Sequence, residues 1–181
     1  MRIFIAINLP ADIKADIYQR LKKWRQSNFP IKWVEEENIH LTIKFCHELE
    51  VEQIEQLISK IKPEVEQFPT FSIKIKAADY LPPYKPRIIY LTAHADELSG
   101  LANKIISLSD QLSFIESEKR KWLPHITLGR IKGALPPAFL QQIKTLRFEY
   151  EFEVKSVEVM SSKLTPTGPI YKIEKSISLT S

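Results

Sequence analysis

Apolar and polar residues alternate along this chain with two different periods, which predicts interleaved strands and helices. Apolar residues at every second position indicate a strand with one buried face, because neighbouring side chains of a strand point in opposite directions. Apolar residues three and four positions apart indicate a helix that buries one side. Segments of both kinds extend over all 181 residues, and no linker divides them. The pattern therefore predicts one domain, or two small lobes that share a core.

The two periods place the elements along the sequence. Strands are predicted to begin at His40 and His125 and to cover 2–8, 31–34, 71–76, 87–93, 148–159 and 170–179. Helices are predicted after Pro136-Pro137 and over 13–24, 54–65 and 98–112. The apolar phase slips near Lys155-Ser156, which indicates a bulge or a change of strand. A turn over 165–169 leads into the last strand.

Two of the predicted strands carry the same polar pair. They contain His40-Leu41-Thr42-Ile43 and His125-Ile126-Thr127-Leu128, and a Lys-Trp dipeptide precedes each of them. On a strand the histidine and the threonine two positions later share one face, while the apolar residues between them face a core. The repetition indicates two related lobes that face each other, although a pattern this short also recurs by chance.

The repeated pair suits chemistry at a phosphodiester. An imidazole accepts or gives a proton near neutral pH, and a threonine hydroxyl donates a hydrogen bond to a phosphate oxygen. In-line displacement at phosphorus needs a base on the attacking side and an acid on the leaving side. Two such pairs across a cleft supply both groups. The residues predicted to form a catalytic site are His40, Thr42, His125 and Thr127.

Composition and the absence of certain motifs limit the classes of protein to which this chain can belong. The net charge of +4 suits a polyanionic partner, and it suits many enzymes of small substrates equally well. The four glycines form neither a dinucleotide-binding motif nor a P-loop, and no serine stands in G-x-S-x-G, which argues against those three classes. Cys46 is the single cysteine, so an internal disulfide is excluded and a reducing cytoplasm fits. The N-terminal apolar run is too short for a signal peptide or a membrane span.

The sequence resembles the 2H phosphoesterase superfamily, and within it the RNA 2′,3′-cyclic phosphodiesterases, also called 2′-5′ RNA ligase-like proteins. The resemblance covers the whole chain, and the paired motifs in their context make it specific. The segments that carry it are 2–7, 32–34, 37–45, 86–91, 124–130, 162–164 and 168–171. One departure is Cys46-His47, which stands where the family commonly has a glycine after the first motif.

The resemblance implies an α+β fold of two lobes, with an antiparallel sheet in each, a pseudo-twofold axis between them, helices outside and a central cleft. It implies a single domain over residues 1–181 made of two interleaved lobes. It also implies hydrolysis of a terminal RNA 2′,3′-cyclic phosphate to a 2′-phosphate without a metal or other cofactor. By this analogy His40 donates a proton to the leaving 3′ oxygen and His125 accepts a proton from water. The motifs alone do not separate these two roles.

Three further residues are candidates for substrate binding. Arg130 has the geometry to clamp a phosphate; strict alternation turns it to the far face of its strand, and a bulge at Gly129 would turn it inward. Lys44 shares the face of the first histidine further along the strand, where it either meets the RNA backbone or is solvated. Tyr84, in a proline-rich loop, can stack on a base.

Neither a metal site nor an obligatory protein partner is expected. The spacing of His40, Cys46 and His47 matches no common set of zinc ligands. We expect RNA ends or cyclic nucleotides as partners, no membrane association, a cytoplasmic location and a monomer. Two alternatives remain open: joining of RNA ends through a 2′-5′ bond in the same cleft, and a non-catalytic module that binds RNA ends. The module would not require both histidines, so the two complete pairs favour an enzyme.

Overall fold

The computed structural model describes residues 1–166 and 168–181. The strands are β1 (Arg2–Asn8), β2 (Ile31–Trp33), β3 (His40–Glu48), β4 (Phe71–Leu81), β5 (Ile88–His94), β6 (His125–Ile131), β7 (Arg147–Val154), β8 (Ser156–Leu164) and β9 (Pro169–Ser178). The helices are α1 (Ala11–Arg20), α2 (Lys22–Arg25), α3 (Val51–Glu66), α4 (Asp96–Asp110) and α5 (Pro137–Thr145), with a 3-10 turn, η1 (Glu36–Asn38). The predicted turn over 165–169 includes Thr167, which lies outside the described residues.

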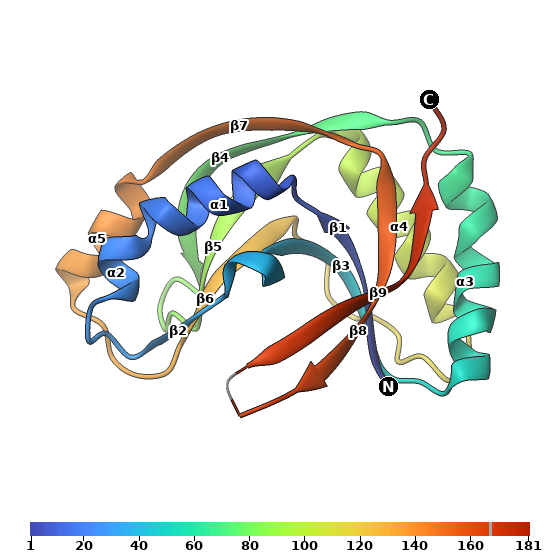
Figure 1. The fold of residues 1–181 in the computed structure, drawn as a ribbon, viewed down its shortest axis with the longest axis horizontal. Helices are drawn as coiled ribbons and strands as arrows, with labels where there is room; N and C mark the ends of the chain where they lie inside the picture. Colours follow the sequence, from blue (N-terminus) through green and yellow to red (C-terminus); the bar gives the residue numbers. More distant parts are fainter. Residues whose placement is uncertain (167) are drawn as a thin grey trace.

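The strands form one curved antiparallel sheet. Their order is β7-β4-β5-β6-β3-β1-β8-β9, and β2 pairs with β6. Figure 1 shows the sheet arching across the molecule, with the β8–β9 hairpin projecting from it. The predicted α+β class with antiparallel strands is therefore confirmed.

The sheet has two halves of matching order. From centre to edge, one half runs β6, β5, β4, β7 and the other runs β3, β1, β8, β9. In each half the strand beside the central one precedes it in the sequence, with α4 or α1 between them. The two expected antiparallel sheets are continuous with each other, because β3 and β6 are paired through Leu41 and Ile126. Both of these side chains are fully buried, so the apolar half of each H-x-T strand joins the two halves into one sheet.

Helices α3 and α4 lie at one end of the arch and α2 and α5 at the other, while α1 runs beneath it (Figure 1). α3 and α4 pack against each other at the right of Figure 1, where α4 contacts β3 and α3 contacts β9. At the other end α5 packs on β4, and Trp24 of α2 meets Phe139 of α5 edge-on with ring centroids 6.3 Å apart. Apolar residues from both halves form one continuous core. Among the described residues, no helix has both the length and the apolar character that crossing a membrane requires.

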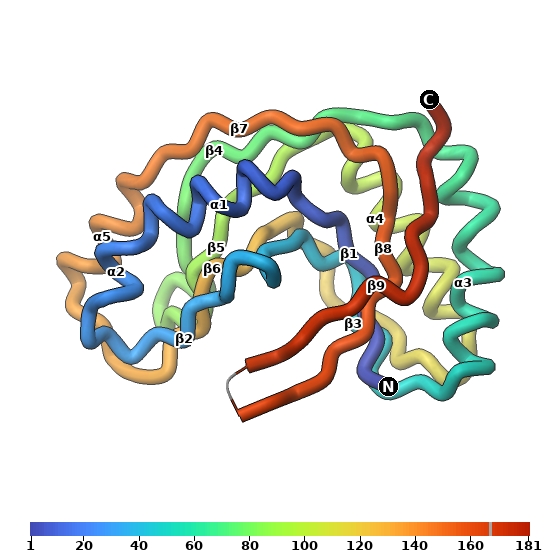
Figure 2. Tube along the Cα trace, viewed as in Figure 1, coloured from blue at the N-terminus to red at the C-terminus, as the bar shows by residue number. Residues whose placement is uncertain are grey.

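The slip of apolar phase near Lys155-Ser156 is a change of strand. β7 ends at Val154 on one edge of the sheet, where it pairs with β4. β8 begins at Ser156 in the other half, where it pairs with β1 and β9. Figure 2 shows the chain leaving one half for the other at this point. Each strand therefore has its own phase, because each packs in a different half of the sheet.

Candidate active site

The two H-x-T strands lie side by side at the centre of the sheet. The pair that joins β3 to β6 is antiparallel, and side chains alternate along each strand. This register puts His40 beside Thr127. It likewise puts Thr42 beside His125, on the same face. The four polar side chains that the sequence singled out thus form a square, in which each histidine neighbours a threonine of the other strand.

The square lines a cavity of about 190 Å³. β2 and the β8–β9 hairpin contribute further walls. The other lining side chains include Lys32, Trp33, Phe45, Arg130 and Tyr171. Cations and aromatic rings around paired imidazoles suit a ligand that combines an anionic group with a ring, as a nucleotide does.

Both imidazoles are held in the same way. His40 Nδ1 lies 2.7 Å from the carbonyl oxygen of Asn38, and His125 Nδ1 lies 2.8 Å from that of Leu123. A carbonyl oxygen only accepts, so each Nδ1 carries a hydrogen and donates it. In the neutral form Nε2 is then the free basic atom of each ring. His40 Nε2 lies 2.9 Å from Thr42 Oγ1, within the square.

Aromatic rings fix the orientation of both imidazoles. The His40 ring packs against Phe4 and Tyr171, with centroid distances of 5.0 and 5.4 Å, and these two rings also contact each other. Tyr90 meets the His125 ring edge-on at 5.8 Å. An imidazole packed by rings and bonded at Nδ1 has little freedom to turn, so Nε2 is presented in a constant direction.

The surroundings of His40 disfavour its charged form. Burial is the largest effect, and it lowers the pKa of His40 from its ordinary value to about 4. The hydrogen bond to Asn38 opposes this, while the nearby positive charges of Lys14 and Arg130 add to it. His40 is therefore neutral in this environment at neutral pH. A proton donor must be protonated, so the donor role expected of His40 depends on a ligand that raises this pKa.

A bulge in β6 settles the position of Arg130. In the pairing of β5 with β6 the register shifts between Thr127 and Gly129, and both Leu128 and Gly129 are buried. The shift returns Arg130 to the cavity face, as a bulge at Gly129 would require. A Cβ on Gly129 would lie 2.8 Å from Cγ2 of Ile31, so only glycine lets β2 approach β6 this closely.

A matching bulge in β3 overturns the expectation for Lys44. In the pairing of β1 with β3 the register shifts between Thr42 and Lys44, which turns Lys44 away from the cavity. Its side chain is buried, and Nζ lies 2.6 Å from Asp110 Oδ1. Phe45, which strict alternation would bury, is instead 56% exposed and lines the cavity. Lys44 therefore belongs to the core behind the site, and Phe45 takes the place on the cavity wall.

Replacing Lys44 with alanine is expected to destabilise the protein by about 3 kcal/mol, because Asp110 would lose its buried counter-charge. Urea unfolding measures this loss. The double variant Lys44→Met/Asp110→Leu should recover most of it, since no unpaired charge is left. Lys74→Ala is the matched control, as its ion pair with Glu151 is exposed. If Lys44→Ala instead leaves stability unchanged and weakens substrate binding, Lys44 contacts the substrate.

The structure also places Tyr84 outside the histidine cavity. Its side chain is 89% exposed on the loop between β4 and β5, and it lines a neighbouring, larger cavity. The two cavities share Ile88 and Arg130. Direct contact of Tyr84 with a group held between the histidines is therefore not supported, whereas contact with a longer ligand is.

Several residues at the site were missed by sequence reasoning. Asn38 donates from Nδ2 to the carbonyl oxygen of Pro169 at 3.0 Å, which ties the start of β9 to the first motif. Lys14 lies close enough for its charge to act on His40. Tyr171 and Lys32 fall within segments that carry the family resemblance, which was the available signal. Among the described residues, no group of three or more His, Cys, Asp or Glu side chains is placed to hold a metal ion.

Comparison with known proteins places the chain in a family. Residues 12–165 match the family model described as the 2′-5′ RNA ligase superfamily. A Thermotoga maritima protein named RNA 2′,3′-cyclic phosphodiesterase is 34% identical, over 96% of this chain and 92% of its own length. A Methanocaldococcus jannaschii protein of the same name is 30% identical, over 97% of this chain and 99% of its own length.

Solved structures share the fold. TT0787 of Thermus thermophilus superposes with a TM-score of 0.86 at 25% identity, covering 98% of this chain and 97% of that one. Escherichia coli LigT complexed with 3′-AMP gives 0.81 at 23% identity, with the same coverage, and shows the likeness of fold alone. Fold and paired strands together define a structure of the 2H phosphoesterase kind. The chain belongs to the 2′-5′ RNA ligase superfamily, and the family resemblance read from its sequence is confirmed.

Proposed function

We propose that this protein hydrolyses the terminal 2′,3′-cyclic phosphate of RNA to a 2′-phosphate, by general acid–base catalysis with two histidines and without a metal. The observation that carries the proposal is the square of His40, Thr42, His125 and Thr127 in one cavity, with both Nδ1 atoms engaged by backbone carbonyls. Relatives that cover nearly all of this chain bear the name RNA 2′,3′-cyclic phosphodiesterase, which supports the same substrate class.

The proposed reaction moves one proton at each side of the phosphorus. His125 Nε2 takes a proton from water, whose oxygen forms a bond to phosphorus. The bond between phosphorus and the 3′ oxygen breaks, and His40 Nε2 gives its proton to that oxygen. The products are a 3′ hydroxyl and a 2′-phosphate. His125 then returns its proton to solvent and His40 regains one, which restores the starting state.

The neighbouring side chains would hold the phosphate during this step. Thr42 and Thr127 each present a hydroxyl that can donate to a non-bridging oxygen. Arg130, at the edge of the cavity, offers a planar guanidinium that can donate two parallel hydrogen bonds to phosphate oxygens. The same anion would oppose the effect of burial on His40 and raise its pKa, because an adjacent negative charge favours the imidazolium. Substrate binding thus supplies the condition that the proton donor needs.

Incubation of the protein with an RNA oligonucleotide ending in a 2′,3′-cyclic phosphate tests the proposal. Conversion to a 2′-phosphate end is the expected result, and chromatography against both isomers identifies the product. A 3′-phosphate product would reverse the assignment of the leaving oxygen. Joining to an added 5′-hydroxyl RNA would favour ligation in the same cavity, and an intact cyclic end with tight binding would favour a non-catalytic module.

Activity is expected to persist in excess EDTA. Each proton transfer in the proposed mechanism is assigned to an imidazole, so no step needs a metal-bound water or a Lewis acid. The measurement compares initial rates before and after chelation, with EDTA removed again by gel filtration as the control for an effect on folding. Loss of activity that a single divalent metal restores would contradict the acid–base mechanism.

A further inference from the structure

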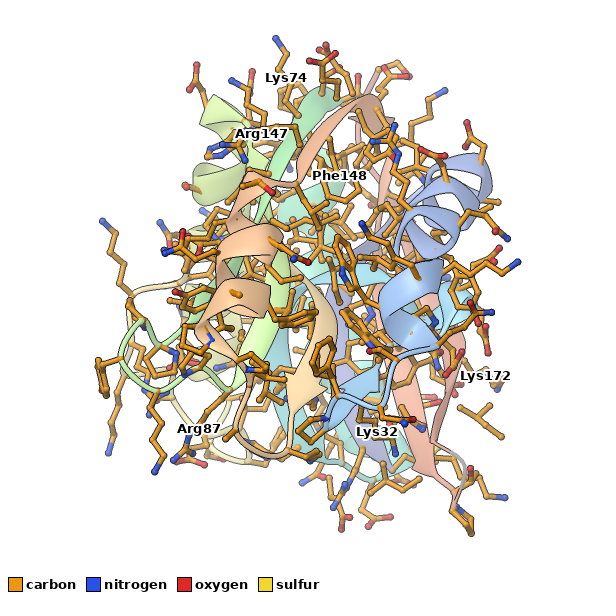
Figure 3. The ribbon with its side chains drawn as sticks, turned by 90° about the vertical axis from the view of Figure 1, so that its left-hand side faces the viewer. Lys32, Lys74, Arg87, Arg147, Phe148 and Lys172 are labelled. Atoms are coloured by element: carbon orange, nitrogen blue, oxygen red, sulfur yellow. The ribbon has the colours of Figure 1, made fainter. Side chains whose placement is uncertain are left out.

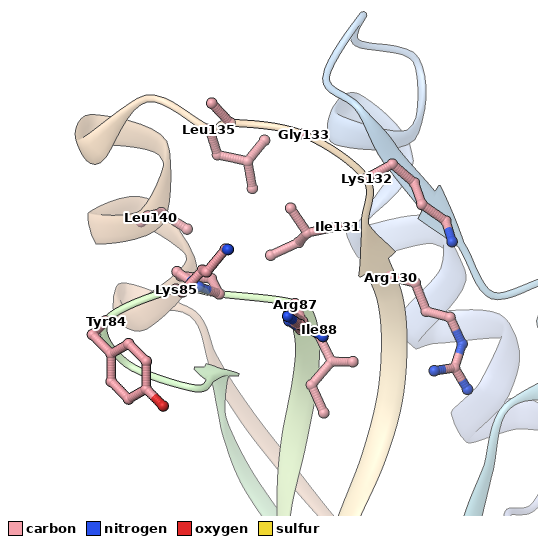
Figure 4. A pocket seen from close by; sticks show the side chains of 12 residues that line it. Tyr84, Lys85, Arg87, Ile88, Arg130, Ile131, Lys132, Gly133, Leu135 and Leu140 are labelled. Carbon is pink, nitrogen blue, oxygen red and sulfur yellow. The ribbon is translucent and has the colours of Figure 1, made fainter.

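A second cavity adjoins the histidine cavity, and it is basic. Its volume is about 930 Å³, against about 190 Å³ for the histidine cavity. No carboxylate lines it among the described residues, while four cations do: Lys85, Arg87, Arg130 and Lys132. We call the cavity bounded by these cations and Tyr84 the basic groove. Figure 4 shows it between the loop that carries Tyr84 and Lys85 and the segment that leads from β6 to α5.

The four cations of the groove have no acidic partner in the described part of the chain, although all four are exposed. Three surface lysines outside the groove, Lys74, Lys144 and Lys172, each lie within 4 Å of a carboxylate. Like charges gathered around one cavity repel one another, and a bound polyanion removes that repulsion. The groove therefore has the electrostatics of a site for several phosphates.

The groove and the histidine cavity are continuous. Ile88 of β5 pairs with Arg130 of β6, and both residues line both cavities. A phosphate between the two histidines would lie on one side of this pair, and the groove opens on the other. A chain bound at its end by the histidines can therefore continue into the groove without leaving the surface.

The rest of the groove offers faces for bases. Ile131 and Leu135 point into it (Figure 4). Tyr84 is 89% exposed on its loop. Two backbone hydrogen bonds anchor the end of this loop: Arg87 N donates to the oxygen of Leu81 at 2.7 Å, and Ile131 N donates to the oxygen of Arg87 at 2.8 Å. An exposed ring on an anchored loop can stack on a base at low entropic cost. Cations interleaved with an aromatic ring are typical of single-stranded nucleic-acid binding.

We propose that the basic groove binds the nucleotides on the 5′ side of the terminal cyclic phosphate, so that the protein prefers an RNA oligonucleotide to a cyclic mononucleotide. This inference rests on the proposed function. Lys85 and Arg87 contact successive phosphates of the strand, and Tyr84 stacks on one of its bases. An acidic protein segment would satisfy the charges but would offer no base to the tyrosine ring, which is why RNA is the better match.

The test measures kcat/KM for 2′,3′-cyclic AMP and for a five-nucleotide RNA ending in a cyclic phosphate. The wild-type protein should prefer the oligonucleotide. Lys85→Ala/Arg87→Ala should lower kcat/KM for the oligonucleotide about 10-fold and reduce the slope of its logarithm against log salt by about 1.4, since two phosphate contacts are lost. The value for the mononucleotide should stay within about 2-fold. Tyr84→Ala should also weaken the oligonucleotide alone, and Tyr84→Phe should not, because stacking needs only the ring.

Lys60→Ala/Lys74→Ala removes the same charge elsewhere and serves as the control; Figure 3 shows Lys74 at the end of the molecule opposite Arg87. The proposal for the groove is wrong if Lys85→Ala/Arg87→Ala lowers kcat/KM equally for both substrates, or if the control variant lowers it as much. If the wild-type protein hydrolyses neither substrate, the proposed function fails, and the groove is judged by binding of a fluorescent 2′-phosphate-ended oligonucleotide. Binding that Lys85→Ala/Arg87→Ala weakens and the control leaves unchanged upholds it; binding that is equal in both, or displaced by an acidic peptide as well as by RNA, rejects it.

Discussion

Alanine in place of His40 or of His125 is expected to lower kcat/KM for a cyclic-phosphate substrate by about 10²–10⁴-fold. Each imidazole has its Nδ1 engaged by a backbone carbonyl, so Nε2 is the one atom that can exchange a proton with a ligand in the cavity. Acid and base act in one displacement. The double variant should therefore be little worse than either single variant, because the remaining partner cannot complete the reaction alone.

The control for this prediction is His94→Ala. His94 lies exposed at the end of β5 and does not line the histidine cavity, so its loss should leave kcat/KM unchanged. Circular dichroism and thermal unfolding verify that each variant keeps its fold. Near-normal turnover in a folded His40→Ala or His125→Ala protein would remove that histidine from the mechanism.

Local periodicity predicted the elements well, because each strand and helix buries one face against the same core. Two strands that share the period and the polar pair were enough to group His40, Thr42, His125 and Thr127 as one candidate site, although the sequence placed the two pairs across a cleft and not side by side. In the structure these strands meet through Leu41 and Ile126, the apolar residues between each pair. The connection of the halves into one sheet could not be read from the sequence, because it depends on a contact between strands that are far apart along the chain.

The bulges mark where periodicity stops being informative. In β6 the bulge has a visible signal, since Gly129 lacks the side chain that would meet Ile31, and Arg130 was accordingly left open. In β3 the bulge falls at Ile43, between Thr42 and Lys44, where no glycine marks it. It arises from the pairing of β3 with β1, a long-range contact. Strict alternation therefore predicted that Lys44 faces the cavity and Phe45 the core, whereas the structure shows the reverse.

His40 should titrate far below an ordinary histidine in the free protein and much nearer to neutrality in a complex. Burial among Phe4, Tyr171 and the hairpin lowers its pKa to about 4, so at pH 7 only about one molecule in a thousand carries the imidazolium. An anionic phosphate against Nε2 should raise this pKa to about 5–7. Substrate binding would then create the protonated donor that hydrolysis requires.

The proposed mechanism needs one imidazole that carries a proton and one that does not, so activity should fall on both the alkaline and the acid side. Because bound phosphate raises the pKa of His40, the alkaline limb of kcat should lie at higher pH than that of kcat/KM, which reports the free enzyme. The two imidazoles share one cavity, so each limb belongs to the coupled pair.

Proton NMR of the hydrogens bonded to the imidazole ring carbons measures the His40 pKa directly. The His40→Gln variant, which lacks these hydrogens, assigns the signal. Titration is performed on the free protein, with inorganic phosphate, and with 2′-AMP, which stands for the product end. The expected order is lowest pKa in the free protein and highest with the nucleotide. A free-protein value near the ordinary histidine value of about 6.5 would contradict the effect of burial. If the His40 pKa is low and neither phosphate nor 2′-AMP raises it, His40 stays neutral when substrate is bound. The proton donor would then have to be His125.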